Sequence, residues 1–203
     1  MTTGRRAWLA TVLSAALLAA CDSKAPPPPI PGTSTTTSTD PAQQAPKVTH
    51  PLDDKEFLAD PCRSLTTPQL TALGLTEPLK NRGDDSFESK VGCGYRVPDP
   101  ETDLLAYVNY YPETTTGLDE VYADRPPTPS PTWTATVIDG YPAVTIAPGD
   151  DRTRCHVNVG TSDDTYFEIT YYYFDWNDWD GRDTCAAATS IAAAVLANMK
   201  AAN

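Results

Sequence analysis

The sequence holds little of what most enzymes use for catalysis. It has only two histidines, no Gly-x-Ser-x-Gly segment and no glycine-rich phosphate loop. It also lacks a Cys-x-x-Cys pair, and His50 and His156 stand at no spacing typical of metal ligands. These absences disfavour a serine or cysteine triad and a zinc site. We therefore expect no cofactor and no metal, and we predict that the protein is not an enzyme.

Long apolar runs are scarce as well, and the clearest one spans residues 7–20. With about 14 residues it is shorter than the roughly 20 that cross a bilayer. Two arginines precede it and Leu18-Ala19-Ala20 ends it, which is the charged, apolar and small-residue order of a secretory signal. Cys21 follows directly, so the segment reads as a lipobox. It predicts a signal peptide over residues 1–20 and a lipoprotein that carries acyl chains such as palmitate on Cys21.

Basic side chains are outnumbered, with 15 Lys and Arg against 27 Asp and Glu and a formal net charge of −12. Without residues 1–20 the balance is 13 to 27, a net charge of −14. This excess disfavours nucleic acid as a partner and disfavours close contact with anionic lipid head groups. We expect the protein on the extracytoplasmic face of the cell membrane, held there by the lipid on Cys21.

Residues 21–55 are rich in Pro, Ser and Thr, including four consecutive prolines at 26–29. Such a segment has too little apolar surface to offset the entropy of ordering it. We predict a disordered tether whose roughly 28 flexible residues reach on the order of 30 Å. Order should begin near Phe57, and residues 56–203 should form one globular domain.

The other four cysteines are Cys62, Cys93, Cys155 and Cys185. An even set in an exported domain predicts two disulfides, because that compartment lets them persist. Four cysteines allow three connectivities, and the sequence by itself does not choose among them.

The domain reads as strands bounded by two helices. Thr67, Pro68 and Gly74 suit the N-cap, first turn and C-terminal cap of a short helix. Apolar residues then recur at helical spacing over about 184–201, with Asp183 as N-cap. A further short helix over 118–122 is possible.

Between the helices, runs rich in β-formers predict strands. Asp139-Gly140 is a type I′ hairpin signal, and a second hairpin turns at residues 162–164. We predict an α+β fold: an antiparallel sheet of about six strands packed against a C-terminal helix and a short N-terminal helix, with two disulfides.

The cysteine contexts resemble a known family. They are Asp60-Pro61-Cys62 before a helix ending Leu73-Gly74-Leu75, then Gly92-Cys93-Gly94-Tyr95, Asp139-Gly140-Tyr141-Pro142-Ala143-Val144, Cys155-His156-Val157-Asn158-Val159 and Asp183-Thr184-Cys185. This pattern, over roughly residues 57–200, is similar to the DUF3558 family of actinobacterial lipoproteins. Tyr95 stands where that family usually has Trp.

The resemblance implies an exported, lipid-anchored domain with two disulfides and no established activity. A weaker similarity is to extracellular sensor domains of mycobacterial receptor kinases. With the family in view we favour the pairs Cys62–Cys93 and Cys155–Cys185, each of which would tie a helix start to a neighbouring strand. Each would close a loop of about 30 residues and contribute on the order of 3–4 kcal/mol.

Aromatic residues concentrate near the end of the last predicted strand. Tyr171, Tyr173, Trp176 and Trp179 could line a groove for a glycan or apolar ligand. Alternation of Phe167, Ile169, Tyr171 and Tyr173 also fits the buried face of a strand, which we favour.

Two acidic features of the sequence are candidate sites. Residues 175–183 do not fit an EF-hand, because Trp179 and Asp180 fall at loop positions 5 and 6. Glu168 would have a raised pKa if it faced an apolar sheet surface, and we expect it to face outward instead.

We therefore expect a non-enzymatic binding or sensor-like module of the cell envelope, with an unknown envelope protein or a small apolar or glycan ligand as partner. The alternatives are a carboxylate-dependent envelope hydrolase, which needs two converging acidic side chains, and an accessory subunit of an envelope complex.

Overall fold

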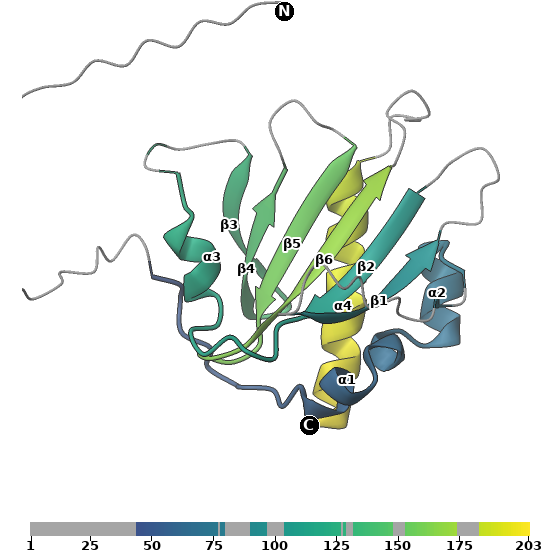
Figure 1. Cartoon of the computed structure of the whole chain (residues 1–203), viewed down its shortest axis with the longest axis horizontal. Coiled ribbons are helices and arrows are strands. Elements are labelled where there is room, and N and C mark those ends of the chain that lie inside the picture. The colour runs from purple at the N-terminus through teal and green to yellow at the C-terminus, as the bar shows by residue number, and fades with distance from the viewer. Residues whose placement is uncertain are drawn as a thin grey trace, which may run out of the picture. The chain divides into compact units, whose positions relative to one another are not determined.

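Six strands form a single antiparallel sheet, as the alternating β-rich runs predict (Figure 1). Along the sheet their order is β1-β2-β6-β5-β4-β3. The strands are β1 (Val91–Arg96), β2 (Leu104–Tyr110), β3 (Trp133–Ile138), β4 (Tyr141–Ile146), β5 (Arg154–Gly160) and β6 (Tyr166–Tyr173). The computed structural model describes residues 44–76, 78–79, 90–96, 104–126, 128, 132–147, 153–173 and 183–203, all within one compact unit, Ser38–Asn203.

Both predicted hairpins are present. Asp139 and Gly140 have φ of 50° and 89°, the positive values that a type I′ turn requires, and they join β3 to β4. In the turn between β5 and β6, the Ser162 hydroxyl accepts hydrogen bonds from the backbone N–H groups of Asp164 and Thr165. Local turn chemistry therefore sets the register of two of the five strand pairs.

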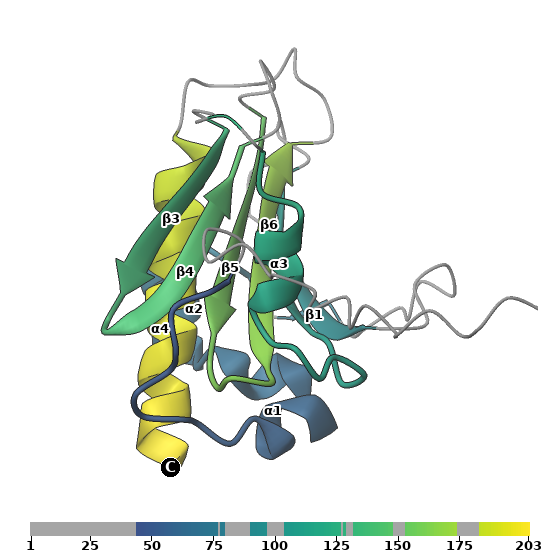
Figure 2. The ribbon, with the colours of Figure 1, turned by 90° about the vertical axis from the view of Figure 1, so that its left-hand side faces the viewer.

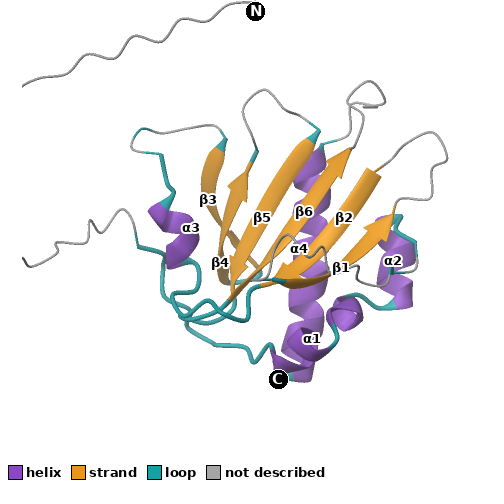
Figure 3. Cartoon of the chain, viewed as in Figure 1, coloured by secondary structure: helices purple, strands orange, loops and turns teal. Residues whose placement is uncertain are grey.

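The helices are α1 (Lys55–Ala59), a 3-10 turn η2 (Pro61–Ser64), α2 (Thr67–Leu73), α3 (Asp119–Ala123) and α4 (Thr184–Ala202) (Figure 3). The predicted N-cap of α2 is wrong by one residue, because Thr66 holds that position and its N–H donates to the side chain of Gln69. Gly74 ends α2 in the left-handed conformation, with φ of 68°, as predicted. The short helix expected at 118–122 is α3.

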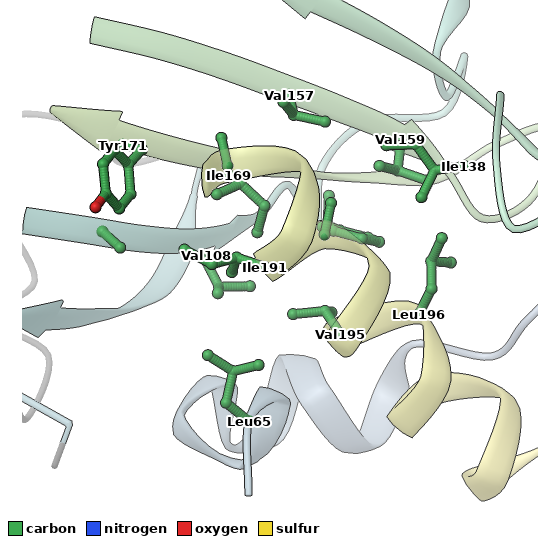
Figure 4. Close-up of a cluster of buried hydrophobic side chains, with 14 of the residues drawn as sticks. Leu65, Val108, Ile138, Val157, Val159, Ile169, Tyr171, Ile191, Val195 and Leu196 are labelled. Atoms are coloured by element: carbon green, nitrogen blue, oxygen red, sulfur yellow. The ribbon is translucent and has the colours of Figure 1, made fainter. Parts of the chain in front are cut away.

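The terminal helix α4 covers one face of the sheet and α3 lies on the other side (Figure 2). Asp183 caps α4 as predicted, accepting hydrogen bonds from the N–H groups of Cys185 and Ala186. Apolar side chains of α4 meet alternate residues of the strands in the main core (Figure 4), among them Ile191, Val195, Leu196, Val108, Val157 and Ile169. With a mean hydropathy of 1.3, α4 is long and apolar enough to cross a membrane, but this packing accounts for its apolar face.

Both favoured disulfides are formed. Cys62–Cys93 joins η2 to β1 and Cys155–Cys185 joins β5 to the first turn of α4, with Cα–Cα distances of 5.0 and 5.1 Å. Each links a helical segment to a strand, as anticipated from the family resemblance.

The folded chain begins earlier than residue 57. Ala45 N–H donates to Asp119 Oδ1 at 2.6 Å, and Leu52 N–H donates to the carbonyl of Thr161 at 2.9 Å. Leu52 is buried in the core, and the backbone carbonyl of His50 accepts a hydrogen bond from the Tyr141 hydroxyl. The expected start of order near Phe57 is therefore about 12 residues too late, because backbone pairing holds a segment whose composition favours disorder.

Candidate functional site

The sheet face opposite α4 is covered by α3 only at one end. There a second apolar cluster forms from Leu118, Val121, Tyr122, Trp133, Val144 and Tyr166. Among the described residues, the rest of this surface is polar and aromatic apart from the buried Leu105, which lies opposite Tyr172, and we call the polar and aromatic part the Glu168 face. It consists of alternate residues of β2, β6 and β5, which the register places side by side: Tyr107, Asn109, Arg154, His156, Asn158, Glu168, Thr170 and Tyr172.

Glu168 lies at the centre of this face, and its carboxylate is nearly enclosed. Thr170 Oγ1 donates to Glu168 Oε1 at 2.7 Å, and Asn109 Nδ2 donates to the same oxygen at 3.1 Å. His156 Nδ1 lies 3.4 Å from Oε2, an ion pair when the imidazole is protonated. The Glu168 side chain is only 15% exposed, so three strands share one satisfied carboxylate.

Burial alone would raise the pKa of Glu168, but the hydrogen bond and charge of His156, with the bonds from Thr170 and Asn109, outweigh it and hold the pKa at about 2. One sequence expectation is corrected in part here. Glu168 faces away from the core under α4, as expected, but its side chain is largely enclosed instead of open to solvent. It does not face an apolar surface, so the condition for a raised pKa is not met. The groups around its carboxylate are polar. Two of them, Asn109 and His156, come from the neighbouring strands β2 and β5 and could not be assigned to Glu168 from the sequence.

This cluster does not have the geometry of a catalytic triad. Thr170 Oγ1 lies 3.3 Å from His156 Nδ1, the same nitrogen that faces Glu168. A triad needs the nucleophile on one ring nitrogen and the acid on the other. Among the described residues, Glu120 is a second carboxylate whose charge reaches this region, but it is exposed and acts on the pKa of Tyr111 and Tyr166. Within the described residues, no second carboxylate converges with Glu168.

Stacked tyrosines flank the cluster on both sides. Tyr107 and Tyr172 lie with ring centroids 6.0 Å apart and 8° between planes, and the Arg154 guanidinium sits 5.9 Å from the Tyr172 ring. Burial raises the pKa of Tyr172 to about 12, with a contribution from Tyr107 that Arg154 partly opposes. At the other end Tyr111 and Tyr166 stack at 4.8 Å. Partly exposed rings with polar tips suit a binding surface.

Beyond Tyr111 the surface is hollowed. An open depression is lined by Tyr111, Glu113, Thr114, Thr115, Thr116 and Glu120. Thr114 Oγ1 donates to Glu120 Oε2 at 3.0 Å, so part of its polar lining is already paired.

The groove predicted from the aromatic cluster is not formed by its two described members. Tyr171 and Tyr173 are 3% and 5% exposed and belong to the core under α4, as the strand-alternation reading favoured. Trp176 and Trp179 lie outside the described residues, and so do Cys21 and most of the loop 175–183.

The surface tyrosine is instead Tyr172, the residue between the two core tyrosines. Its partner Tyr107 sits in β2, and sequence reasoning marked neither as part of a site. The alternation of side chains along β6 could have identified Tyr172 as a surface residue. Phe167 and Ile169 belong to the core, so the residues between and after them, Glu168, Thr170 and Tyr172, must share the other face.

Among the residues that the structure describes, no group of three or more His, Cys, Asp or Glu side chains could hold a metal ion.

Comparison with known proteins gives one informative match. No curated protein and no solved structure matches the chain. Residues 16–198, most of the chain, match a family described as a protein of unknown function, DUF3558. The two disulfides and the helix-covered sheet agree with the features expected from that resemblance. The chain is therefore a member of the DUF3558 family.

Proposed function

We propose that the chain is an exported lipoprotein of the cell envelope, anchored through Cys21, whose domain is a non-enzymatic binding module. The observation that carries the export is the joint presence of a leader ending Leu18-Ala19-Ala20 directly before Cys21 and a domain with two disulfides. Disulfides persist in oxidising compartments outside the cytoplasm. A small domain with a covalently tied core also suits that setting.

The anchor is tested by growing the host with an alkyne analogue of palmitate and comparing the full chain with its Cys21→Ser variant. Label on the first and none on the second supports the proposal. Ser23→Ala is the matched control, since it changes the neighbourhood of the lipobox but keeps the thiol, and it should label normally. Unlabelled wild-type protein, or four free thiols in the folded chain, would overturn the export.

The binding role is supported by the chemistry of the Glu168 face. Tyr107, Tyr172 and Arg154 offer stacked, partly exposed rings with a cation, a combination that fits an apolar or glycan ligand. The enclosed Glu168 holds three strands in register beneath them, so it acts as a positioning residue. Its carboxylate, with a pKa near 2, is unsuited to donate a proton near neutral pH.

Native mass spectrometry of the full chain purified from its own envelope tests the binding role. We expect an additional mass on the wild type that is lost in Tyr172→Ala and retained in Ser190→Ala, which changes an exposed position of α4. An equal additional mass on both variants would place binding elsewhere, and turnover of an envelope polymer that stops in Glu168→Gln would favour the hydrolase alternative.

A further inference from the structure

Among the described residues, no segment covers the outer edge of β3, which we call the bare edge. Trp133 and Ile138 are buried at its two ends, but the four residues between them are exposed, and the Val137 side chain is 66% exposed. β3 is the last strand in the order of the sheet, and within the described part of the chain its strand partner is β4 alone. Its central residues are thus available on the side away from β4.

The register identifies which backbone groups point outward. Ala147 N–H donates to the carbonyl of Thr132, so these two residues form a hydrogen-bonded pair. The pairing of β3 with β4 continues from there without a bulge, from Trp133 opposite Ile146 to Ile138 opposite Tyr141. In an antiparallel pair, residues that bond the partner alternate with residues that bond away from it. Thr134 and Thr136 therefore bond β4, and the N–H and C=O groups of Ala135 and Val137 point to the free edge.

Nothing in the strand discourages pairing with another chain. Natural proteins protect edge strands with charges, proline, bulges or a covering segment. The sequence of β3, Trp-Thr-Ala-Thr-Val-Ile, contains no charge and no proline and is rich in β-branched residues. An exposed, uncharged strand of this composition is a template for an added strand.

We propose that β3 pairs antiparallel with β3 of a second copy of this chain, about a twofold axis at Thr136. In this register each Val137 lies opposite Ala135 of the second copy, so the outward backbone groups of both residues bond each other. A large apolar side chain then meets a small one on one face, and the two Thr136 side chains meet on the other. The pairing stays clear of Trp133, which is buried beneath Tyr122 and Arg125.

The fold allows both copies to sit on one membrane. Ala45 lies against α3, on the sheet face opposite α4. A twofold axis perpendicular to the sheet keeps that face on the same side in both copies. Ala45 therefore lies on the same side of the joint sheet in both copies. This is required if each copy is anchored to one membrane at Cys21, as proposed above.

The assembly closes at two copies. The opposite edge, β1, is covered by the segment after α2, so the joint sheet has no second bare edge of this kind within the described residues. Without residues 1–20 each chain carries a net charge of −14, which opposes association at low ionic strength. Added salt screens that repulsion, so pairing should strengthen as salt rises.

Cysteine cross-linking of the full chain in its own envelope membranes tests the register. Residues opposite each other at a non-hydrogen-bonded position have Cα atoms about 4.5 Å apart, within disulfide reach. Thr136→Cys should therefore form a dimer on mild oxidation, at least about ten-fold more than the controls. The matched controls are Thr134→Cys, on the same face of the same strand but off the axis, and Ser190→Cys on α4. Equal dimer in all three, or none in Thr136→Cys, overturns the proposal.

A backbone variant tests the hydrogen bonds independently. Ala135→Pro removes an outward N–H and leaves the bonds to β4 intact, so the domain should stay folded while salt-dependent dimer measured by sedimentation falls at least about ten-fold. An unchanged dimer in a folded Ala135→Pro chain would show that another surface associates. Neither readout depends on palmitate labelling, so failure here is distinct from failure of the anchor.

Discussion

The two edges of the sheet differ in their exposure: another segment of the chain covers β1, whereas the middle of β3 is exposed. At β1 the chain after α2 runs along the outer edge, where Leu79 N–H donates to the carbonyl of Gly94 and Thr76 N–H to that of Arg96, each at 2.8 Å. Cys93 and Tyr95 are fully buried there. At β3 four consecutive residues are exposed.

The comparison shows that this chain has the means to cover an edge and uses them on one side only. Holding Thr76 and Leu79 against β1 costs conformational entropy. The Cys62–Cys93 disulfide links the chain ahead of these two residues to β1 and so reduces the entropy lost on folding. No comparable tie reaches β3 among the described residues, which is consistent with an edge that remains available.

Breaking the covered edge should have the largest effect. Replacing Cys62 and Cys93 together with Ala removes the tie, and we expect the free energy of unfolding to fall by about 2–5 kcal/mol. Chemical denaturation of the full chain measures the loss. Hydrogen exchange should accelerate most in β1, because its outer partner segment is released.

The double variant Cys155→Ala with Cys185→Ala is the comparison. It should also destabilise the domain, but with faster exchange at the start of α4 and in β5 instead of β1. Equal acceleration in β1 for both double variants would mean that the Cys62–Cys93 bond has no special role in covering that edge.

Glu168, which lies in the sheet between the two edges, should give the next largest effect on the free energy of unfolding. Its folded pKa of about 2 lies below its ordinary value of 4.5, so the unfolded chain binds the proton more tightly. The resulting stability, on the order of 3 kcal/mol, is present above pH 4.5 and is lost as pH falls toward 2. The wild type should lose this contribution on acidification, and Glu168→Gln should lack it throughout. Glu113→Gln, at an exposed position, should follow the wild-type profile.

The sequence predicted the strands, the hairpin at Asp139-Gly140 and the terminal helix because each depends on neighbours a few residues away. It could not place Glu168, because the contact to Asn109 spans 59 residues and exists only once β6 inserts between β2 and β5. The same limit applies to Tyr171 and Tyr172. Alternation shows that they face opposite ways, but only the position of α4 decides which one is buried.

Glycine at position 92 offers a smaller test at the covered edge. A Cβ there would lie 2.5 Å from Asn109 Oδ1 and 2.7 Å from the backbone carbonyl oxygen of Val108. Gly92→Ala should therefore destabilise the domain by about 1–3 kcal/mol in chemical denaturation. Ala135→Val enlarges a side chain at the bare edge, where we expect a change within about 0.5 kcal/mol. Similar losses at both positions would contradict the difference between the edges.

The smallest change in stability, with the clearest change in assembly, is expected at Val137. Because its side chain is 66% exposed, Val137→Lys should alter the free energy of unfolding of the monomer by no more than about 0.5 kcal/mol. In the proposed pair the lysine would lie opposite Ala135 of the second copy and diagonal to the second copy's lysine, and a charge on an edge strand blocks pairing. Sedimentation of the full chain at high salt should then show monomer, whereas Val137→Thr, which keeps the β-branched shape without charge, should still dimerise. A Val137→Lys chain that dimerises like the wild type would mean that the bare edge of β3 is not the contact.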